Sequence, residues 1–140
     1  MNKKLLLIAC LLIYSNGWAY NEQDLAKFKA LNACEGCDLS GVSFINADLS
    51  GVSFINTDLS DANLTGANLR NAYLTGANLT GASLLEAHIS NTSFSRANLT
   101  GANLTGADLT YPTILSDANF TQATLIGANL SGVSLIDTNL

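Results

Sequence analysis

The sequence predicts an all-β solenoid, a single rod in which short extended segments alternate with corners. Two observations predict this class. Apolar side chains recur at every fifth residue from Cys37 onward, and small or turn-forming residues fill the positions between them. Self-similarity at a short fixed period indicates a repeat architecture. A period of five excludes an amphipathic helix, whose apolar positions recur every three to four residues.

Fifteen consecutive five-residue units run from Cys37 to Tyr111, with ANLTG as a typical example. The third residue of each unit is Leu, Ile or Phe, and the first is small. The second is mostly Asp, Asn or Ser, the fourth mostly Ser or Thr, and the fifth mostly Gly, Asn or Asp. Side chains alternate faces in an extended chain, so the first and third positions point to one side and form a core. Gly, Asn and Asp tolerate positive φ, so the fifth position forms a corner.

The third positions are therefore expected to stack in the interior of the rod. One unit cannot bury its apolar pair alone, so successive coils must cover one another. Each buried Leu or Phe contributes about 1.5–3 kcal/mol. The predicted stacking residues are Leu39, Phe44, Leu49, Phe54, Leu59, Leu64, Leu69, Leu74, Leu79, Phe94, Leu99, Leu104, Leu109 and Phe120.

The repeat slips once, at Tyr111-Pro112. The next clear centre after Leu109 is Phe120, eleven residues further on, and regular units continue from Thr113. Proline cannot donate a ladder hydrogen bond and is found at bulges or edges. A slip inside an extended segment would turn every later leucine outward. The surplus residue is therefore expected to bulge at a corner.

The A-(D/N)-L-x-x unit resembles that of the pentapeptide repeat proteins, and the resemblance covers residues 37–140. It implies a right-handed quadrilateral β-helix, with four pentapeptides, or twenty residues, in each coil. Residues 37–140 would then form about five coils and a rod of roughly 25 Å.

Residues 1–19 are predicted to be a signal peptide. Lys3 and Lys4 precede an apolar stretch over residues 5–14, and small residues lead to a cleavage site after Ala19. The stretch is too short for a membrane span. Lipidation at Cys10 is an alternative, but it would leave an apolar region of only five residues. We expect export to the periplasm or the cell exterior.

Residues 20–36 do not match the repeat and are expected to form a capping helix and a linker. Asn21 can cap the helix, with acidic residues in its first turn. Leu25, Phe28 and Leu31 form an apolar stripe that would cover the open edge of the first coil. No cap follows the last unit. That end could be a tolerated frayed end, or it could bind a partner or a second copy to form a homodimer.

Cys34 and Cys37 are the only cysteine pair after cleavage. Export permits a disulfide, and we favour a disulfide or two buried thiols over a redox or metal role. His88 lies at an outward second position without a nucleophile beside it. The sequence therefore predicts no enzyme, no catalytic residues, no cofactor and no metal site.

Cleavage removes two of the six cations, so the formal charge changes from −5 to −7. This charge disfavours nucleic acid and anionic membranes as partners. The leading hypothesis is a non-enzymatic rod that binds an unknown protein or has a structural role. Stacking by twenty places outward apolar residues on two opposite faces, which are the candidate interaction surface: Ile45, Leu85 and Ile126 on one, and Ile55, Tyr73 and Ile136 on the other.

Two other functions are considered. The resemblance implies a DNA-mimic mode, in which an acidic pentapeptide rod acts on DNA gyrase in the cytoplasm. The signal peptide argues against this mode, because gyrase is cytoplasmic. The other function is an ice- or surface-binding face built on Asn and Thr columns, which lack a strict Thr-x-Thr array.

Overall fold

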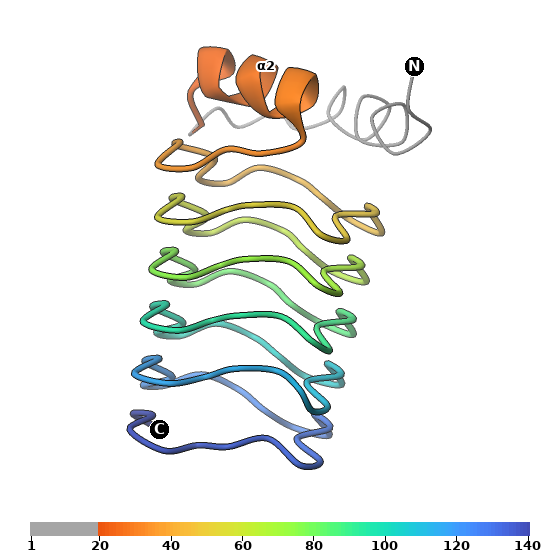
Figure 1. Ribbon diagram of the computed structural model, residues 1–140, viewed down its shortest axis with the longest axis vertical. Coiled ribbons are helices and arrows are strands. Elements are labelled where there is room, and N and C mark those ends of the chain that lie inside the picture. Colours follow the sequence, from red (N-terminus) through yellow and green to blue (C-terminus); the bar gives the residue numbers. More distant parts are fainter. Residues whose placement is uncertain (1–19) are drawn as a thin grey trace.

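A computed structural model describes residues 20–140, in which one helix lies above a stack of coils (Figure 1). The helix, α2, spans Glu22–Leu31. Within residues 20–140 the extended segments pair through isolated parallel β-bridges and form no longer strands. The predicted signal peptide and the lipidation alternative at Cys10 lie outside the described residues.

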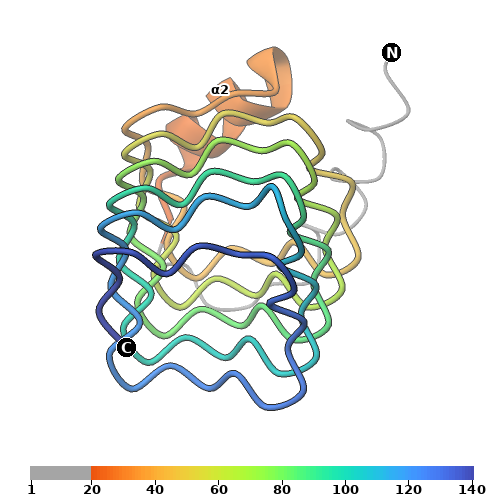
Figure 2. The same cartoon turned by 60° about the horizontal axis from the view of Figure 1, so that its bottom comes forward.

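The bridges define a coil of twenty residues with four bridge positions, and the coils stack as a four-sided tube (Figure 2). From residue 37 onward each bridged residue is the second of its pentapeptide, and before the bulge its partner lies twenty residues later. The pairs of one coil are Asp38–Asp58, Ser43–Asn63, Asp48–Asn68 and Ser53–Tyr73. This register confirms the expected stacking by twenty.

Backbone hydrogen bonds join each coil to the next. The Leu59 amide donates to the Asn78 carbonyl at 2.7 Å, and the Asn78 amide donates to the Thr57 carbonyl at 3.0 Å. Within a coil, the Ala62 amide donates to the Leu59 carbonyl at 3.1 Å and closes a corner. The fifth positions have positive φ, as at Gly76 with φ +69°, except Tyr111 at the bulge. The corner prediction is therefore confirmed.

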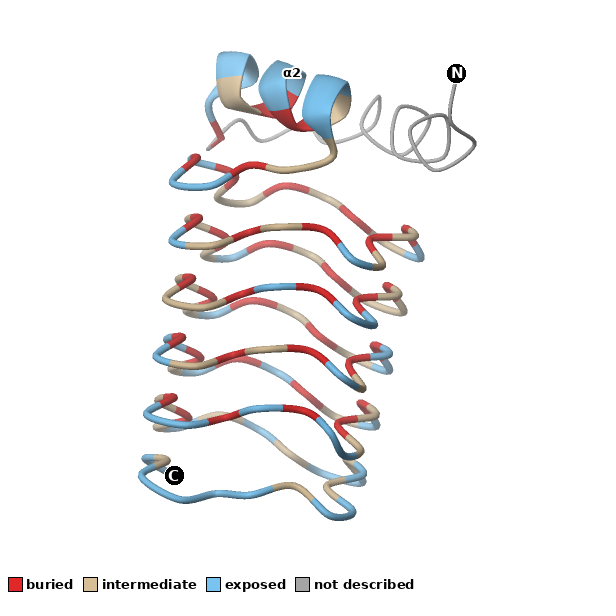
Figure 3. Ribbon diagram, in the orientation of Figure 1, coloured by how far each residue is buried: buried red, intermediate tan, exposed pale blue. Residues whose placement is uncertain are grey.

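The interior is built of apolar residues, and buried positions recur in every coil except the last (Figure 3). Phe120 is 3% exposed, and the other thirteen predicted stacking residues are fully buried. Four first positions hold threonine instead of a small apolar residue, and three of them, Thr57, Thr92 and Thr113, are buried, while Thr138 is half-buried. Their hydroxyls donate to backbone carbonyls one coil earlier, as from Thr92 to Leu69 at 2.7 Å. These bonds offset the cost of burying the hydroxyl.

The extra residue lies at a corner, as predicted. The bridge register lengthens to twenty-one residues between Ser93 and Ile114 and returns to twenty between Ile114 and Ser134. The turn falls on Tyr111 and Pro112, which are joined by a cis peptide bond. Leu115 stays buried at 1% exposure. The bulge therefore absorbs the residue without turning the later leucines outward.

Helix α2 covers the N-terminal end of the tube. The Asn21 side chain accepts hydrogen bonds from two amides of the first turn, at 2.9 and 3.3 Å. Phe28 is fully buried, with its ring 5.5 Å from that of Phe44 and 5.2 Å from that of Phe54. The Asp24 carboxylate accepts from the amide of residue 38 at 2.9 Å. The helix therefore supplies both an apolar lid and a polar partner for the first coil.

The prediction that Leu31 belongs to the apolar stripe facing the first coil is wrong. Leu25 and Phe28 are buried, but Leu31 is 65% exposed. Three residues advance an α-helix by 300°, so each step of three moves the side chain about 60° back around the axis. Leu31 therefore lies about 120° from Leu25 and points past the edge of the coil.

Candidate interaction surfaces

The outward apolar residues differ in how far they reach into solvent. Tyr73, Ile126 and Ile136 are 54%, 72% and 71% exposed. The other three predicted residues are only half-buried: Ile45, Ile55 and Leu85. The ladder places Ile45, Leu85 and Ile126 in one column and Ile55 and Ile136 in another, on opposite sides of the four-sided coil.

Two exposed apolar side chains beside the bulge were missed from the sequence. Tyr111 is 73% exposed and Ile114 is 50% exposed. Ile114 occupies the second position of its unit, and second positions point outward. Its exposure could therefore have been predicted from the sequence. The bridges from Tyr73 to Ser93 and from Ser93 to Ile114 put Ile114 in the column that holds Tyr73, and Tyr111 lies at the corner just before it.

The cysteines enclose the first corner of the solenoid. Their sulfurs are bonded at 2.02 Å, with the Cα atoms 5.4 Å apart. Cys34 and Cys37 are 0% and 2% exposed. The Cys34 amide donates to the Ser53 carbonyl at 2.9 Å, which ties this corner to the next coil. A bonded, buried pair at this position links the cap to the repeat.

The Asn and Thr columns use their polar groups within the protein. Asn78 donates to the Asp58 carboxylate of the preceding coil at 3.1 Å. The Thr80 hydroxyl donates to the Asn78 side-chain oxygen at 2.7 Å, and Thr100 bonds Asn98 in the same way. These threonine hydroxyls donate their protons to asparagine side chains and not to surface water. This bonding disfavours the ice-binding function.

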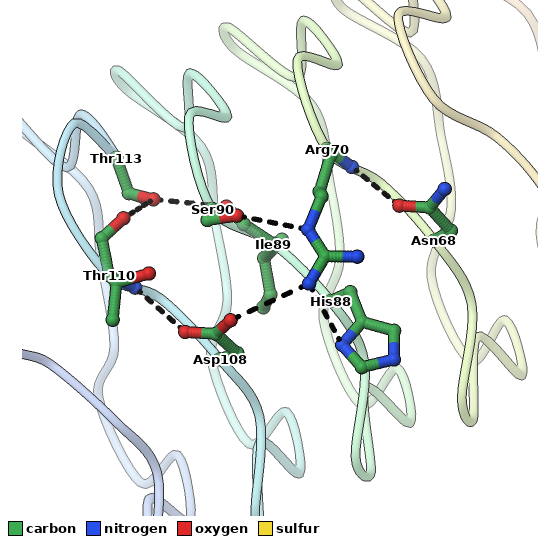
Figure 4. A network of polar contacts seen from close by, with 8 residues as sticks. All are labelled: Asn68, Arg70, His88, Ile89, Ser90, Asp108, Thr110 and Thr113. Atoms are coloured by element: carbon green, nitrogen blue, oxygen red, sulfur yellow. Dashed lines mark hydrogen bonds and ion pairs between the residues drawn. The ribbon is translucent and has the colours of Figure 1, made fainter.

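His88 lies on a third side of the tube, beside Arg70 (Figure 4). The Arg70 guanidinium lies 3.5 Å from His88 Nδ1 and 3.8 Å from the Asp108 carboxylate, and it donates to the Ser90 hydroxyl at 3.2 Å. Both members of the ion pair are partly exposed, so solvent screening limits it to at most about 1 kcal/mol. Residues 20–140 contain no cluster of three potential metal ligands among His, Cys, Asp and Glu.

The C-terminal end of the described coils presents an apolar layer. It surrounds a hollow of about 60 Å³ lined by Leu115, Phe120, Leu125, Leu130, Leu135 and Leu140. Leu135 is 39% exposed and Leu140 is 67% exposed. One coil earlier the Leu104 amide donates to the Thr124 carbonyl, whereas the Leu125 amide has no backbone acceptor within residues 20–140. This C-terminal layer therefore combines apolar side chains with an open β edge.

A four-sided parallel solenoid with a five-residue period is the class of protein that this geometry defines. The family profile of pentapeptide repeats matches residues 37–76, 72–110 and 113–140, and the chain belongs to this family. Members form right-handed quadrilateral β-helices. The match is interrupted only at residues 111 and 112, where the structure places the bulge.

Solved structures of pentapeptide repeat proteins resemble the chain. HetL, from Nostoc sp. strain PCC 7120, is a protein involved in heterocyst differentiation regulation. It is 33% identical over 77% of this chain, which spans 48% of HetL, with a TM-score of 0.53. Rfr23, from Cyanothece 51142, is 25% identical over 84% of this chain and 92% of its own, with a TM-score of 0.44.

A third resemblance is to a protein of the Arabidopsis thaliana thylakoid lumen. It is 32% identical over 72% of this chain and 70% of its own, with a TM-score of 0.38. A search of curated protein sequences gave no match. In the part of the chain that the structure describes, no helix is long and apolar enough to cross a membrane.

Proposed function

We propose that this chain is an exported pentapeptide-repeat rod that acts as a non-enzymatic protein-interaction or structural module. Three features support export: the basic residues Lys3 and Lys4, the apolar stretch over residues 5–14, and the small residues before Ala19. The disulfide between Cys34 and Cys37 suits an oxidising compartment. Family membership supports an interaction or structural role rather than catalysis.

The C-terminal layer is the single observation that carries the interaction role. Leu135 and Leu140 would bury apolar area if another chain covered them, and the open amides of this coil would gain acceptors. Residues 121–140 carry one charged side chain, Asp137, although the cleaved chain has a formal charge of −7. Repulsion between charged side chains is therefore small where two copies meet at this end. We propose a second copy as the occupant.

Sedimentation equilibrium of the cleaved chain tests this contact. Leu140→Asp should shift the protein to monomer, because a carboxylate would be buried in the contact. Ile126→Asp is the matched control, because Ile126 is exposed in the same coil but lies on a side column. A monomer at every concentration, or equal dissociation by both variants, would rule out the second copy.

The gyrase-directed DNA mimic is the alternative function. A mimic of a duplex needs its negative charges in rows on one surface. In this structure the acidic residues are spread over all four sides of the coil, since the register separates Asp58, Glu86, Asp108 and Asp117. Their spread supports the interaction rod over the mimic. Inhibition of gyrase supercoiling by the purified rod would favour the mimic instead.

A further inference from the structure

The side of the rod around the bulge carries two adjoining hollows with no charged residue in their walls. One, of about 200 Å³, is lined by Asn71, Ala72, Tyr73, Asn91, Thr92, Ser93, Pro112 and Ile114. The other, of about 270 Å³, is lined by Tyr111, Pro112, Thr113, Ile114, Leu115, Ser116, Gly132 and Ser134. Pro112 and Ile114 belong to both, so the hollows form one surface, here called the bulge groove.

The bulge creates this groove. The extra residue at the corner brings Pro112 into the wall of both hollows, and it leaves Tyr111 73% exposed. Tyr111 packs over Gly132, where an added Cβ would lie 3.1 Å from the Tyr111 Cβ. From Tyr73 to Ser134 the column crosses three coil spacings, or about 14 Å. The groove is therefore long enough for a chain-like ligand rather than a single small group.

An asparagine pair supplies unpaired polar groups beside the aromatic ring. The Asn91 side-chain amide donates to the Asn71 side-chain oxygen. An Asn side chain has two donor hydrogens on nitrogen and an acceptor oxygen, so the Asn71 NH₂ and the Asn91 oxygen remain available to a ligand. Neither atom has another partner within residues 20–140. Tyr73 lies in the same wall, 54% exposed.

This combination selects the chemistry of the ligand. A charged ligand would lose hydration at an uncharged wall without gaining an opposite charge. Tyr and Pro offer flat apolar surface, while amides and hydroxyls offer hydrogen bonds. A sugar ring has a C–H face for the first and hydroxyl groups for the second. We propose that the bulge groove binds a neutral oligosaccharide, with Tyr73 stacked on one ring and the Asn71–Asn91 pair bonded to its hydroxyls.

An extended peptide fits this side less well. Peptides that add to a sheet need free backbone groups at an edge. Here the Ser93 amide donates to the Ala72 carbonyl at 3.1 Å, and the Ile114 amide donates to the Thr92 carbonyl at 3.0 Å. These two amides are already paired across the column, and the free side-chain groups of Asn71 and Asn91 suit a ligand rich in hydroxyls. This inference does not depend on export or on the C-terminal contact.

The test is a titration of the ¹⁵N-labelled cleaved chain with maltohexaose, cellohexaose and the hexamer of N-acetylglucosamine, followed by ¹H–¹⁵N correlation spectra. At least one probe should shift the side-chain NH₂ signals of Asn71 and Asn91. Tyr73→Ser should weaken that binding about tenfold through loss of stacking. The variant should fold, because the same column holds serine one coil earlier and one coil later, at Ser53 and Ser93.

Leu85→Thr is the matched control, since its column holds Thr65 and Thr105 in the neighbouring coils and lies on the opposite side. It should leave binding unchanged. The inference is wrong if none of the three sugars shifts these signals, or if the two variants weaken binding equally. It is also wrong if decaproline or polygalacturonate shifts them while the neutral sugars do not.

Discussion

Phe28→Ala tests how helix α2 stabilises the solenoid. Phe28 is fully buried and contacts the rings of Phe44 and Phe54 at centroid distances of 5.5 and 5.2 Å. Truncation of a buried Phe to Ala costs about 3–5 kcal/mol, and the edge-to-face contact of Phe28 with Phe44 adds to the stabilisation that comes from burial alone. We expect a loss of about 4 kcal/mol, a large fraction of the 5–15 kcal/mol typical of a domain.

Urea unfolding followed by circular dichroism gives the free energy of unfolding, and Leu31→Ala is the matched control. Leu31 lies on the same helix but is 65% exposed, so its truncation should change stability by less than about 0.5 kcal/mol. Hydrogen exchange should show faster opening of the first coil in Phe28→Ala, because repeat proteins couple mainly to their neighbours. Equal losses in the two variants would refute the assignment of α2 as a cap.

Three further predictions concern corners, the disulfide and the core. Gly81→Ala and Gly101→Ala should each destabilise the protein by about 1–2 kcal/mol, because each glycine has φ near +68°, a left-handed conformation that costs a residue with a Cβ. Thermal unfolding would measure both variants, and unchanged stability would contradict the left-handed corners. Reduction of Cys34–Cys37 should lower the free energy of unfolding by about 2 kcal/mol, the entropy of a short closed loop, with no effect of reductant on a double serine variant. Thr92→Val should cost about 0.5–1.5 kcal/mol in urea unfolding, through loss of its buried 2.7 Å hydrogen bond, and a gain in stability would contradict that bond.

The sequence predicted the interior and the corners because both depend on the five-residue period alone. Leu79 is buried since it is a third position, and Gly76 takes positive φ since it is a fifth position. The bulge at Pro112 could also be predicted, because a ladder bond cannot form there. The hand of the coil came from the family resemblance and not from the pattern.

The surfaces were harder to predict because they depend on residues twenty or more positions apart. The pairing of Arg70 with Asp108 across two coils, and the groove beside Ile114, follow from the stacking register together with the size of the bulge. The exposure of Leu31 depends on where the helix axis lies over the first coil. None of these is set by a neighbour in sequence.

The N-terminus of the protein recovered from its own cell tests the proposed function most directly. Fractionation followed by intact-mass measurement and N-terminal sequencing should find the chain in the periplasm or the medium, beginning at Tyr20 after removal of residues 1–19. A lipid-modified chain beginning at Cys10 would contradict the cleavage site. An uncleaved chain beginning at Met1 in the cytoplasm would contradict export and favour the gyrase-directed alternative.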